Sequence, residues 1–496
     1  MRQLQKYIVI IGSGFAGLSA ACVLAQEGYQ VTILEKNEQP GGRARVWQQD
    51  GFTFDMGPSW YWMPDVFENF FTLFGKTPAD YYNLKRLDPA YRIYFGKADF
   101  MEVPGTRFEL VQLFERIEPG SSTKLDAFLK QAEYKYRVSM SDYVFRPSHN
   151  ITEFIDLNLI RKSLKMQLLG NMRSHVNRYF KNQRLRQLLE FPVLFLGATP
   201  QNTPAMYSLM NYADLVLGTW YPMGGMHQIV KAMVSLAESL GVEIRTDTEV
   251  TKIDVDQNKA TQVKTNKGDM QADMVIAGAD YAYVDQQLLD EPYRNYSARY
   301  WNKRTLSPSS LIFYIGLNKK VHGIQHHNLF FYADFERHAR QIYTSPQWPE
   351  QPLFYVCCPS KTDNNVAPEG CENLFFLMPI APGLQDNVTA RQKYFELLLT
   401  RFESLTGQGI RENIVVNRSY AVNDFKADYY SFKGNAYGLA NTLSQTAFFK
   451  PAMRNKHVKN LLYTGQLTVP GPGVPPAIIS GQIAAAEAMR YLKKNR

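Results

Sequence analysis

The chain has 496 residues, of which 45% are hydrophobic, 20% charged and 13% aromatic, and its formal net charge is +9. This length predicts about three domain-sized units, and the composition excludes disordered, fibrous and collagen-like classes. No apolar run approaches the ~20 residues that a membrane-spanning helix needs. A strand predicted at 7–11 leaves no room for a secretory leader, so we expect a cytoplasmic protein. The four cysteines lack CxxC or zinc-type spacing, which predicts buried free thiols.

The N-terminal sequence predicts a βαβ unit with a glycine-rich turn. Residues 8–11 predict a buried parallel strand, and a helix of small residues follows from about position 15. In the turn between them, Gly12 permits a sharp bend, Gly14 lets the backbone approach a pyrophosphate, and Gly17 allows the helix to pack closely on the sheet. This combination predicts a Rossmann-like dinucleotide-binding unit.

The predicted helix start and second strand supply further groups for a nucleotide. Unpaired N–H groups and the positive end of the helix dipole favour phosphate. The second strand, 31–34, ends at Glu35, 23 residues beyond Gly12, where a carboxylate can accept hydrogen bonds from an adenosine ribose. A glycine-rich turn in an ordinary α/β protein is the weaker interpretation, because strand, glycines, helix and acidic residue occur together.

The residues after Glu35 favour FAD over NAD. Gly41 and Gly42 form a second glycine pair, and the guanidinium of Arg43 can neutralise a phosphate. The segment FTFDMGPS follows at 52–59. Together the glycine pair and this segment, which contains an FDxG motif, resemble the flavin-containing amine oxidase and phytoene desaturase superfamily. The resemblance implies non-covalent FAD, with Arg43 near the pyrophosphate and the segment 56–59 in contact with the flavin. No second GxGxxG follows a predicted strand and no CxxxxC is present, so no nicotinamide site is predicted.

The segment 161–189 concentrates the positive charge of the chain. It carries eight Lys and Arg residues and no Asp or Glu, so it alone supplies +8. Such a surface could dock on an anionic membrane leaflet. Lys165 falls inside the apolar stripe of the predicted helix, so a solvated helical face is an almost equal alternative. Nucleic-acid binding ranks below both, because no recognition fold accompanies the charge.

Two later segments match the same superfamily. Residues 220–244 combine a Gly-Gly turn with a helix, and the resemblance implies that Val250, just beyond, passes the adenine. At 470–481 the sequence PGPGVPPAIISG is similar to carotenoid desaturases, and a helix start in it suits donation of backbone N–H groups to the flavin. In two departures, Gln466 stands where many relatives have Asp, and Met223 stands where many phytoene desaturases have Arg.

The motifs and the resemblance together define the predicted site. The predicted cofactor-binding residues are Gly12, Ser13, Gly14, Phe15, Ala16, Gly17, Glu35, Lys36, Gly42, Arg43, Met56, Gly57, Pro58, Ser59, Val250, Gly465, Gln466, Gly473, Val474 and Pro475. No catalytic residue is predicted, because HExxH, GxSxG and a convincing carboxylate pair are absent. No metal ligand is predicted either, since the pair His326 and His327 lacks metal-ligand spacing, and surface or satisfied histidines are expected.

The predicted fold class is α/β. A discontinuous Rossmann-like FAD-binding domain is expected from 1–79, 220–299 and 456–496. Residues 80–219 predict a largely helical region that contacts the substrate and the membrane, and 300–455 predict a substrate-binding domain with a mixed β-sheet.

The resemblance implies an FAD-dependent carotenoid desaturase of carotenoid biosynthesis. It would act on a phytoene-type substrate, or at the 3,4 position of a hydroxycarotenoid or γ-carotene-type substrate, with a quinone or oxygen as electron acceptor. Aromatic residues after the flavin-contacting loop support an apolar tunnel, and a substrate stored in lipid implies peripheral association with the inner face of the membrane. The alternatives are a carotenoid cis-trans isomerase, a retinol-saturase-like flavoprotein, an amine oxidase and a non-catalytic carotenoid carrier.

Overall fold

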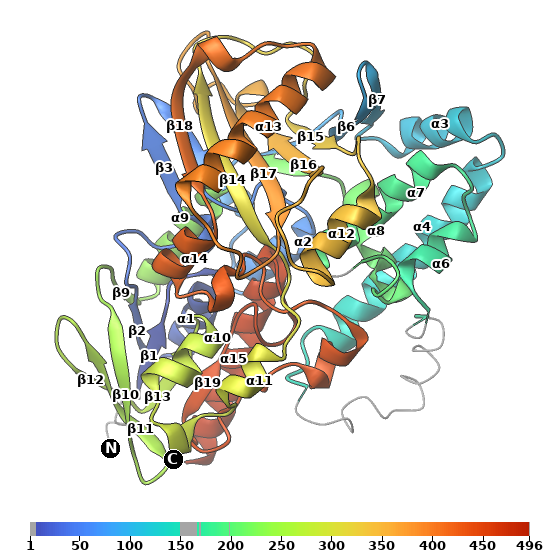
Figure 1. The fold of residues 1–496 in the computed structure, drawn as a ribbon. Helices are drawn as coiled ribbons and strands as arrows, with labels where there is room; N and C mark the ends of the chain where they lie inside the picture. Colours follow the sequence, from blue (N-terminus) through green and yellow to red (C-terminus); the bar gives the residue numbers. More distant parts are fainter. Residues whose placement is uncertain (1–5, 149–165, 168–169, 198, 496) are drawn as a thin grey trace.

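The computed structural model of the protein describes residues 6–148, 166–167, 170–197 and 199–495. A parallel sheet lies near the two chain termini, a larger sheet lies beyond it, and a group of helices flanks the larger sheet (Figure 1). Within these ranges, no helix combines the length and the apolar character needed to cross a membrane.

The parallel sheet draws its five strands from distant parts of the chain. Its order is β19-β13-β1-β2-β9, and every neighbouring pair is parallel. The strands are β1 (Tyr7–Ile11), β2 (Gln30–Leu34), β9 (Glu243–Arg245), β13 (Met274–Ala277) and β19 (Leu461–Tyr463). In the central strand β1, Val9 and Ile10 are fully buried, as expected of a parallel strand covered on both faces. The predicted Rossmann-like sheet is therefore confirmed.

Helices α1 (Phe15–Gln26) and α15 (Val474–Lys494) cross on one face of this sheet with unusually close backbones. A Cβ added to Gly481 would lie 2.3 Å from the carbonyl oxygen of Ala16 and 2.7 Å from Cβ of Ser19. Ser19 Oγ also donates a hydrogen bond to the carbonyl of Ile478 at 2.7 Å. Small residues at the crossing therefore join the two ends of the sequence.

The substitution Gly481→Ala is expected to lower the free energy of unfolding by about 1–3 kcal/mol, because the added methyl group overlaps backbone that cannot move without separating α1 from α15. Chemical denaturation of the full chain measures the change. Gly409→Ala is the matched control, since an added Cβ there meets nothing within 4 Å. Equal stability of the two variants would contradict the role assigned to this crossing.

The larger sheet has seven strands in the order β18-β14-β17-β16-β15-β6-β7. Its pairs are antiparallel except β15 with β6, which is parallel, so the predicted mixed sheet is confirmed. The strands are β6 (Tyr91–Gly96), β7 (Asp99–Val103), β14 (Ser309–Leu317), β15 (His327–Phe330), β16 (Phe354–Cys357), β17 (Glu372–Ile380) and β18 (Ile414–Tyr420). Strands β6 and β7 thus come from the range that the sequence assigns to helices. The predicted domain limits stay predictions.

Smaller sheets and helices complete the fold. The remaining strands are β3 (Val46–Gln49), β4 (Phe52–Asp55), β5 (Leu84–Arg86), β8 (Trp220–Pro222), β10 (Val250–Asp256), β11 (Lys259–Thr265) and β12 (Met270–Gln271). The remaining helices are α2 (Pro64–Thr72), α3 (Arg107–Ile117), α4 (Ser122–Val138), α6 (Met172–Asn177), α7 (Gln183–Glu190), α8 (Leu209–Leu215), α9 (His227–Ser239), α10 (Tyr281–Tyr283), α11 (Ala298–Asn302), α12 (Phe335–Tyr343), α13 (Val388–Thr406) and α14 (Val422–Tyr429). Helix α13 covers the larger sheet on the side away from the candidate site: Phe402 packs on Phe330 and Phe376.

The helices α3, α4, α6, α7 and α8 lie together beside the larger sheet (Figure 1). A buried lysine joins part of this group: Lys135 Nζ donates hydrogen bonds to the carbonyl of Ala205 at 3.0 Å and to Ser208 Oγ at 2.9 Å. Burial lowers the pKa of Lys135 to about 8. These polar contacts satisfy an ammonium group that would otherwise be costly in the core.

Candidate cofactor and substrate site

The turn between β1 and α1 has the geometry of a phosphate cradle. Gly12 has φ +93°, a conformation that residues with a side chain rarely adopt, and a Cβ on Gly17 would lie 2.1 Å from the Gly12 carbonyl oxygen. Gly14 is the N-cap of α1, no side chain caps this helix start, and an added Cβ on Gly14 would meet nothing within 4 Å among the described residues. The first N–H groups of α1 therefore have no side-chain cap, and a phosphate could accept hydrogen bonds from them.

Glu35 joins the end of β2 to this turn. The carboxylate is buried; its Oε2 accepts hydrogen bonds from the N–H of Ser13 at 2.9 Å and from Ser13 Oγ at 2.7 Å. Its Oε1 accepts from the N–H and the side-chain amide of Asn37, both at 3.0 Å. These four donors fill the usual accepting capacity of a carboxylate. A ribose diol can therefore bond to Glu35 only by replacing one of them.

The second glycine pair packs directly on the first turn. The N–H of Gly41 donates to the carbonyl of Ser13 at 3.0 Å, and a Cβ on Gly42 would lie 3.4 Å from Gly14 Cα. Arg43 Nη2 donates to Ser431 Oγ at 3.2 Å, whereas its buried Nε has no hydrogen-bond partner among the described residues. A buried guanidinium N–H without a partner is costly, and a pyrophosphate oxygen would satisfy it.

A third group of predicted residues lies where β10 begins. Lys36 Nζ lies 3.9 Å from the ring centroid of Tyr430, and the hydroxyl of Tyr430 donates to Glu249 Oε1 at 2.5 Å. Val250 is the first residue of β10 and is buried. The N–H of Thr248 donates to the carbonyl of Glu35 at 2.8 Å, so this segment adjoins the end of β2.

The segment 56–59 is held between the two sheets. A Cβ on Gly57 would lie 2.4 Å from the carbonyl oxygen of Arg43, and the hydroxyl of Tyr314 in β14 donates to the carbonyl of Met56 at 2.8 Å. Pro58 is half-buried, and Ser59 Oγ accepts a hydrogen bond from the hydroxyl of Tyr355 in β16 at 3.0 Å. The predicted flavin-contacting segment therefore contacts the larger sheet directly.

The C-terminal segment contacts the first turn of α1 and contains a second helix start. Gly465 has φ +100°, its N–H donates to Ser480 Oγ at 2.9 Å, and an added Cβ would lie 3.8 Å from Cβ of Ala16. Gly473 is the N-cap of α15 with no side-chain cap, and Val474 and Pro475 form the first turn. Gln466 Nε2 donates to Asn435 Oδ1 at 3.3 Å and does not reach a charged partner. Phe15 and Ala16 are buried beneath this arrangement.

Asp55, which is not among the predicted cofactor-binding residues, holds the turn at Gly224 and Gly225. Its Oδ2 accepts from the N–H of Met226 at 2.7 Å and its Oδ1 from the N–H of His227 at 2.9 Å, so the carboxylate caps the start of α9. Burial raises the pKa of Asp55 to about 6, although the two backbone N–H groups favour the charged form. The sequence signal for this role is the FDxG motif, whose aspartate precedes the flavin-contacting segment.

The raised pKa of Asp55 gives a pH-dependent contribution to stability. Because the folded-state pKa exceeds that of an unfolded aspartate, the contribution is complete below pH ~4 and is lost as the pH rises through 6. We expect Asp55→Asn to remove this decline between pH 4 and 6.5, measured as the difference in unfolding free energy from the wild type. The exposed Asp50→Asn is the control, and parallel curves for Asp55→Asn and the wild type would contradict the assignment.

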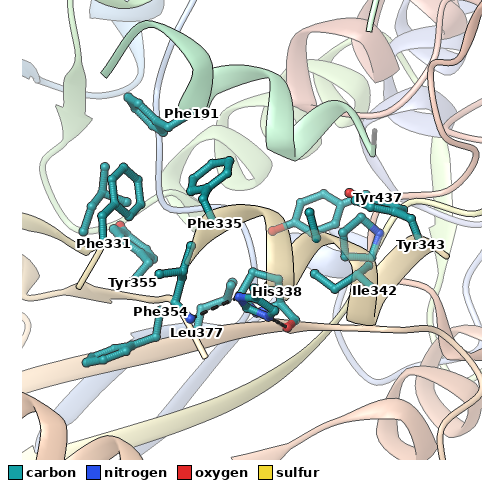
Figure 2. A pocket seen from close by; sticks show the side chains of 15 residues that line it. Phe191, Phe331, Phe335, His338, Ile342, Tyr343, Phe354, Tyr355, Leu377 and Tyr437 are labelled. Atoms are coloured by element: carbon teal, nitrogen blue, oxygen red, sulfur yellow. Dashed lines mark hydrogen bonds between the residues drawn. The ribbon is translucent and has the colours of Figure 1, made fainter. Parts of the chain in front are cut away.

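A largely apolar cavity of about 70 Å³ lies between α12 and the larger sheet. Figure 2 shows its wall, with Phe335, His338 and Ile342 on α12 facing Tyr355 and Leu377 on the sheet. The other lining residues are Phe191, Pro308, Leu329, Phe331, Ala339, Tyr343, Leu353, Phe354, Pro379 and Tyr437. In the sequence, this wall corresponds to the helical spacing of residues 335, 338, 339 and 342. Periodicity alone does not distinguish a helix that lines a cavity from a helix that packs in the core.

His338 is the one histidine in the cavity wall, and both of its ring nitrogens are engaged. Nε2 lies 2.9 Å from the carbonyl oxygen of Pro379, and Nδ1 accepts a hydrogen bond from the N–H of Leu353 at 3.1 Å (Figure 2). Burial lowers the pKa of His338 to about 4, so the ring is neutral at pH 7. This histidine orients the wall and offers no free base to a ligand.

Tyr355 connects the cavity to the predicted flavin-contacting segment. The same residue lines the cavity and donates its hydroxyl hydrogen bond to Ser59. Beside it, the ring of Trp60 stacks on His327 with centroids 4.0 Å apart and an angle of 12°. His326 and His327 are both buried, contrary to the expectation of surface or satisfied histidines, and their Nε2 atoms have no partner among the described residues.

A surface groove of about 800 Å³, lined by polar and aromatic residues, shares Phe331 and Phe335 with the cavity. The groove contains part of the predicted basic segment, and two of its three arginines form ion pairs. Arg173 contacts Glu190 at 2.6 Å and Glu336 at 2.7 Å, and Arg184 contacts Asp99 at 2.7 Å. The basic residues at 161, 162 and 165 lie outside the described residues. Docking of the basic segment on a membrane therefore stays a prediction.

The comparisons with known proteins agree with this geometry. Residues 15–489 match the family model of flavin-containing amine oxidoreductases, and the chain belongs to this family. It is 43% identical to a carotenoid 3,4-desaturase from Haloarcula japonica, over 96% of this chain and 97% of the relative. It is 32% identical to a zeta-carotene-forming phytoene desaturase from Myxococcus xanthus, over 98% of this chain and 94% of the relative.

Solved structures share the fold at low sequence identity. An oxidoreductase from Methanosarcina mazei has a TM-score of 0.64 at 16% identity, covering 96% of this chain and 99% of that one. Putrescine oxidase bound to putrescine has a TM-score of 0.63 at 14% identity, covering 98% and 99%. The predicted fold class, the FAD cofactor and the assignment as an oxidoreductase are confirmed.

The substitution Glu35→Gln is expected to weaken FAD binding roughly 10- to 100-fold, since hydrogen bonds to a charged group contribute about 1.5–3 kcal/mol and the carboxylate also holds Ser13 in place. Titration of the flavin-free protein with FAD, followed by flavin fluorescence, measures the affinity. The exposed Glu27→Gln, at the far end of α1, is the matched control. Equal affinities for both variants would show that Glu35 does not contact the cofactor.

Proposed function

We propose that the protein is an FAD-dependent carotenoid desaturase that introduces C=C bonds into a carotenoid. The observation that carries the proposal is the apolar cavity, whose wall residue Tyr355 is hydrogen-bonded to Ser59 of the predicted flavin-contacting segment. A relative that is 43% identical over nearly its whole length carries the name carotenoid 3,4-desaturase. A phytoene desaturase matches at 32% and a 4,4'-diapophytoene desaturase at 30%. A CH–CH bond held in this cavity would lie beside the flavin.

The lining favours a hydrocarbon substrate over an amine. Among the described residues that line the cavity there is no carboxylate, and the histidine present is neutral and engaged at both nitrogens. An amine oxidase must bind a polar, often cationic substrate, which this lining would desolvate without compensation. The bound flavin would supply hydride acceptance, while the chain orients the substrate and excludes water.

The volume of the cavity favours binding of only one end of the substrate. A tetraterpene is about as long as the ~30 Å hydrocarbon core of a bilayer, whereas the cavity holds about 70 Å³. One end group would therefore lie in the cavity, and the remaining polyene would extend into the groove along its aromatic lining residues Phe331, Tyr332 and Phe335. This arrangement is consistent with 3,4-desaturation, a reaction near the end of a carotenoid.

The finer assignments belong to the same proposal. The cofactor would be held by the twenty predicted residues, with the α1 start and Arg43 at the pyrophosphate, Glu35 at the ribose, and segments 56–59 and 473–475 at the flavin ring. A lipid-stored substrate supports peripheral association with the inner face of the membrane, with a quinone or oxygen as electron acceptor. Residues 1–79, 220–299 and 456–496 would form the FAD-binding domain. Residues 80–219 would form the helical region, and residues 300–455 would form the β-rich substrate-binding domain.

Coexpression in a host that accumulates carotenoid intermediates tests the proposal. We expect a product with a red-shifted absorption spectrum, because each added double bond extends the conjugation. Ala339→Phe should abolish the product while FAD stays bound, since Ala339 is a buried residue of the cavity wall. Arg340→Phe, on the exposed side of α12, should retain it. An isomer shift without added conjugation would indicate an isomerase, and unchanged pigment would support a carrier; either result contradicts desaturation.

A further inference from the structure

Two histidines and a cysteine meet in the core beside the flavin-contacting segment. His327 opens β15 and Cys357 ends β16, and the antiparallel register places them directly opposite each other. His326 comes immediately before β15, and its ring centroid lies 4.4 Å from that of His327. One ligand atom from each of the three side chains lies within 4.8 Å of those of the other two, and all three residues are buried.

The hydrogen bonds of the two imidazoles leave one nitrogen of each ring unused. His326 Nδ1 lies 2.8 Å from Thr362 Oγ1, and His327 Nδ1 lies 2.6 Å from the hydroxyl of Tyr355. The Nε2 atoms are buried and have no hydrogen-bond partner among the described residues. A buried polar atom without a partner costs about 1–3 kcal/mol, so a core rarely retains one on each of two adjacent residues.

This pattern of hydrogen bonds is the one found around metal-bound histidines. One ring nitrogen binds the metal, and the other is held by an outer hydrogen bond that fixes the ring. Thr362 and Tyr355 occupy the outer positions here. A cavity of about 10 Å³, lined in part by His326, Cys357 and Asp55, adjoins the cluster and is large enough for one water molecule.

We propose that His326, His327 and Cys357 form a buried binding site for a zinc-type divalent cation, with a water molecule in the adjoining cavity as fourth ligand. Imidazole and thiolate select such a cation over Mg²⁺ and Ca²⁺, which prefer oxygen ligands. Binding breaks the S–H bond of Cys357 and releases one proton to solvent. The thiolate and the carboxylate of Asp55, which lines the same cavity, together balance the two positive charges of the cation.

The required adjustment is small. Tetrahedral zinc, with Zn–N of about 2.0–2.1 Å and Zn–S of about 2.3 Å, holds its ligand atoms about 3.3–3.8 Å apart. Since the ligand atoms lie within 4.8 Å of one another, the two atoms of each pair need to approach by about 1.5 Å or less. The bound cation would fix the His327 ring on which Trp60 stacks and, through it, the hydroxyl of Tyr355 in the cavity wall.

Zinc analysis of the full chain, purified with FAD, tests the site. After dialysis against a chelator and titration with zinc chloride, we expect about one zinc per chain to survive desalting. X-ray absorption at the zinc edge should show one sulfur at about 2.3 Å and nitrogens at about 2.0–2.1 Å. Cys357→Ser and His326→Gln should each lose the zinc, whereas Cys371→Ser, a half-buried cysteine outside the cluster, should retain it.

Two results would overturn the proposal: no stoichiometric zinc on the wild type, or zinc bound without a sulfur ligand. Equal zinc on the wild type and on folded Cys357→Ser would also overturn it. The X-ray absorption spectrum of the wild type tests the zinc site even where Cys357→Ser or His326→Gln fails to fold. The outcome is independent of the proposed function, because zinc content is measured without a carotenoid and desaturation is measured without reference to zinc.

Discussion

The structure depends on how closely backbone approaches backbone around the first glycine turn. A Cβ on Gly17 would overlap the carbonyl oxygen of Gly12, and Gly42 lies against Gly14. At the next contact, Gly481 brings α15 against α1. The absence of side chains at these positions therefore packs α15 against the first turns of α1, whose start has no side-chain cap. The partial positive charge at this helix start suits an anionic cofactor.

Buried polar groups connect this cradle to the second sheet. Asp55 caps α9, Tyr314 donates to the carbonyl of Met56, and Tyr355 donates to Ser59. Each of these bonds involves a residue of 55–59, that is, the last residue of β4 or the segment after it. Because a buried hydrogen bond is costly to break, the segment has little freedom to move away from the cavity wall. The position of the cavity relative to the cofactor region follows from three side chains on different elements.

Much of the cofactor region could be predicted from the sequence because its determinants are local. Glycine spacing, a buried strand and the acidic residue at 35 lie within a few dozen residues, and the FDxG and C-terminal motifs extend the same pattern. The hydrogen bonds of the Glu35 carboxylate were less predictable. Nothing in the sequence indicates that Ser13 and Asn37 already donate hydrogen bonds to it.

The apolar cavity and the histidine cluster were not predictable, because strand pairing creates them. His327 and Cys357 are thirty residues apart and come together only through the register of β15 with β16. Strands β6 and β7 lie in a range with mainly helical character and join the larger sheet through one parallel pair. The ion pairs of the basic segment were not predictable for a similar reason, since the partners of Arg173 and Arg184 include Glu336 and Asp99, which are distant in sequence.

The pairing of β13 with β19 has a consequence for synthesis of the chain. The parallel sheet is complete only when residues 461–463 have been made, and Ser19 bonds to Ile478, 459 positions later. During translation the first βαβ unit therefore remains without its outer strand and without the helix that covers it. Contacts this distant slow folding and leave apolar strand edges uncovered meanwhile. A nascent chain of this kind needs protection from aggregation until β19 and α15 have left the ribosome.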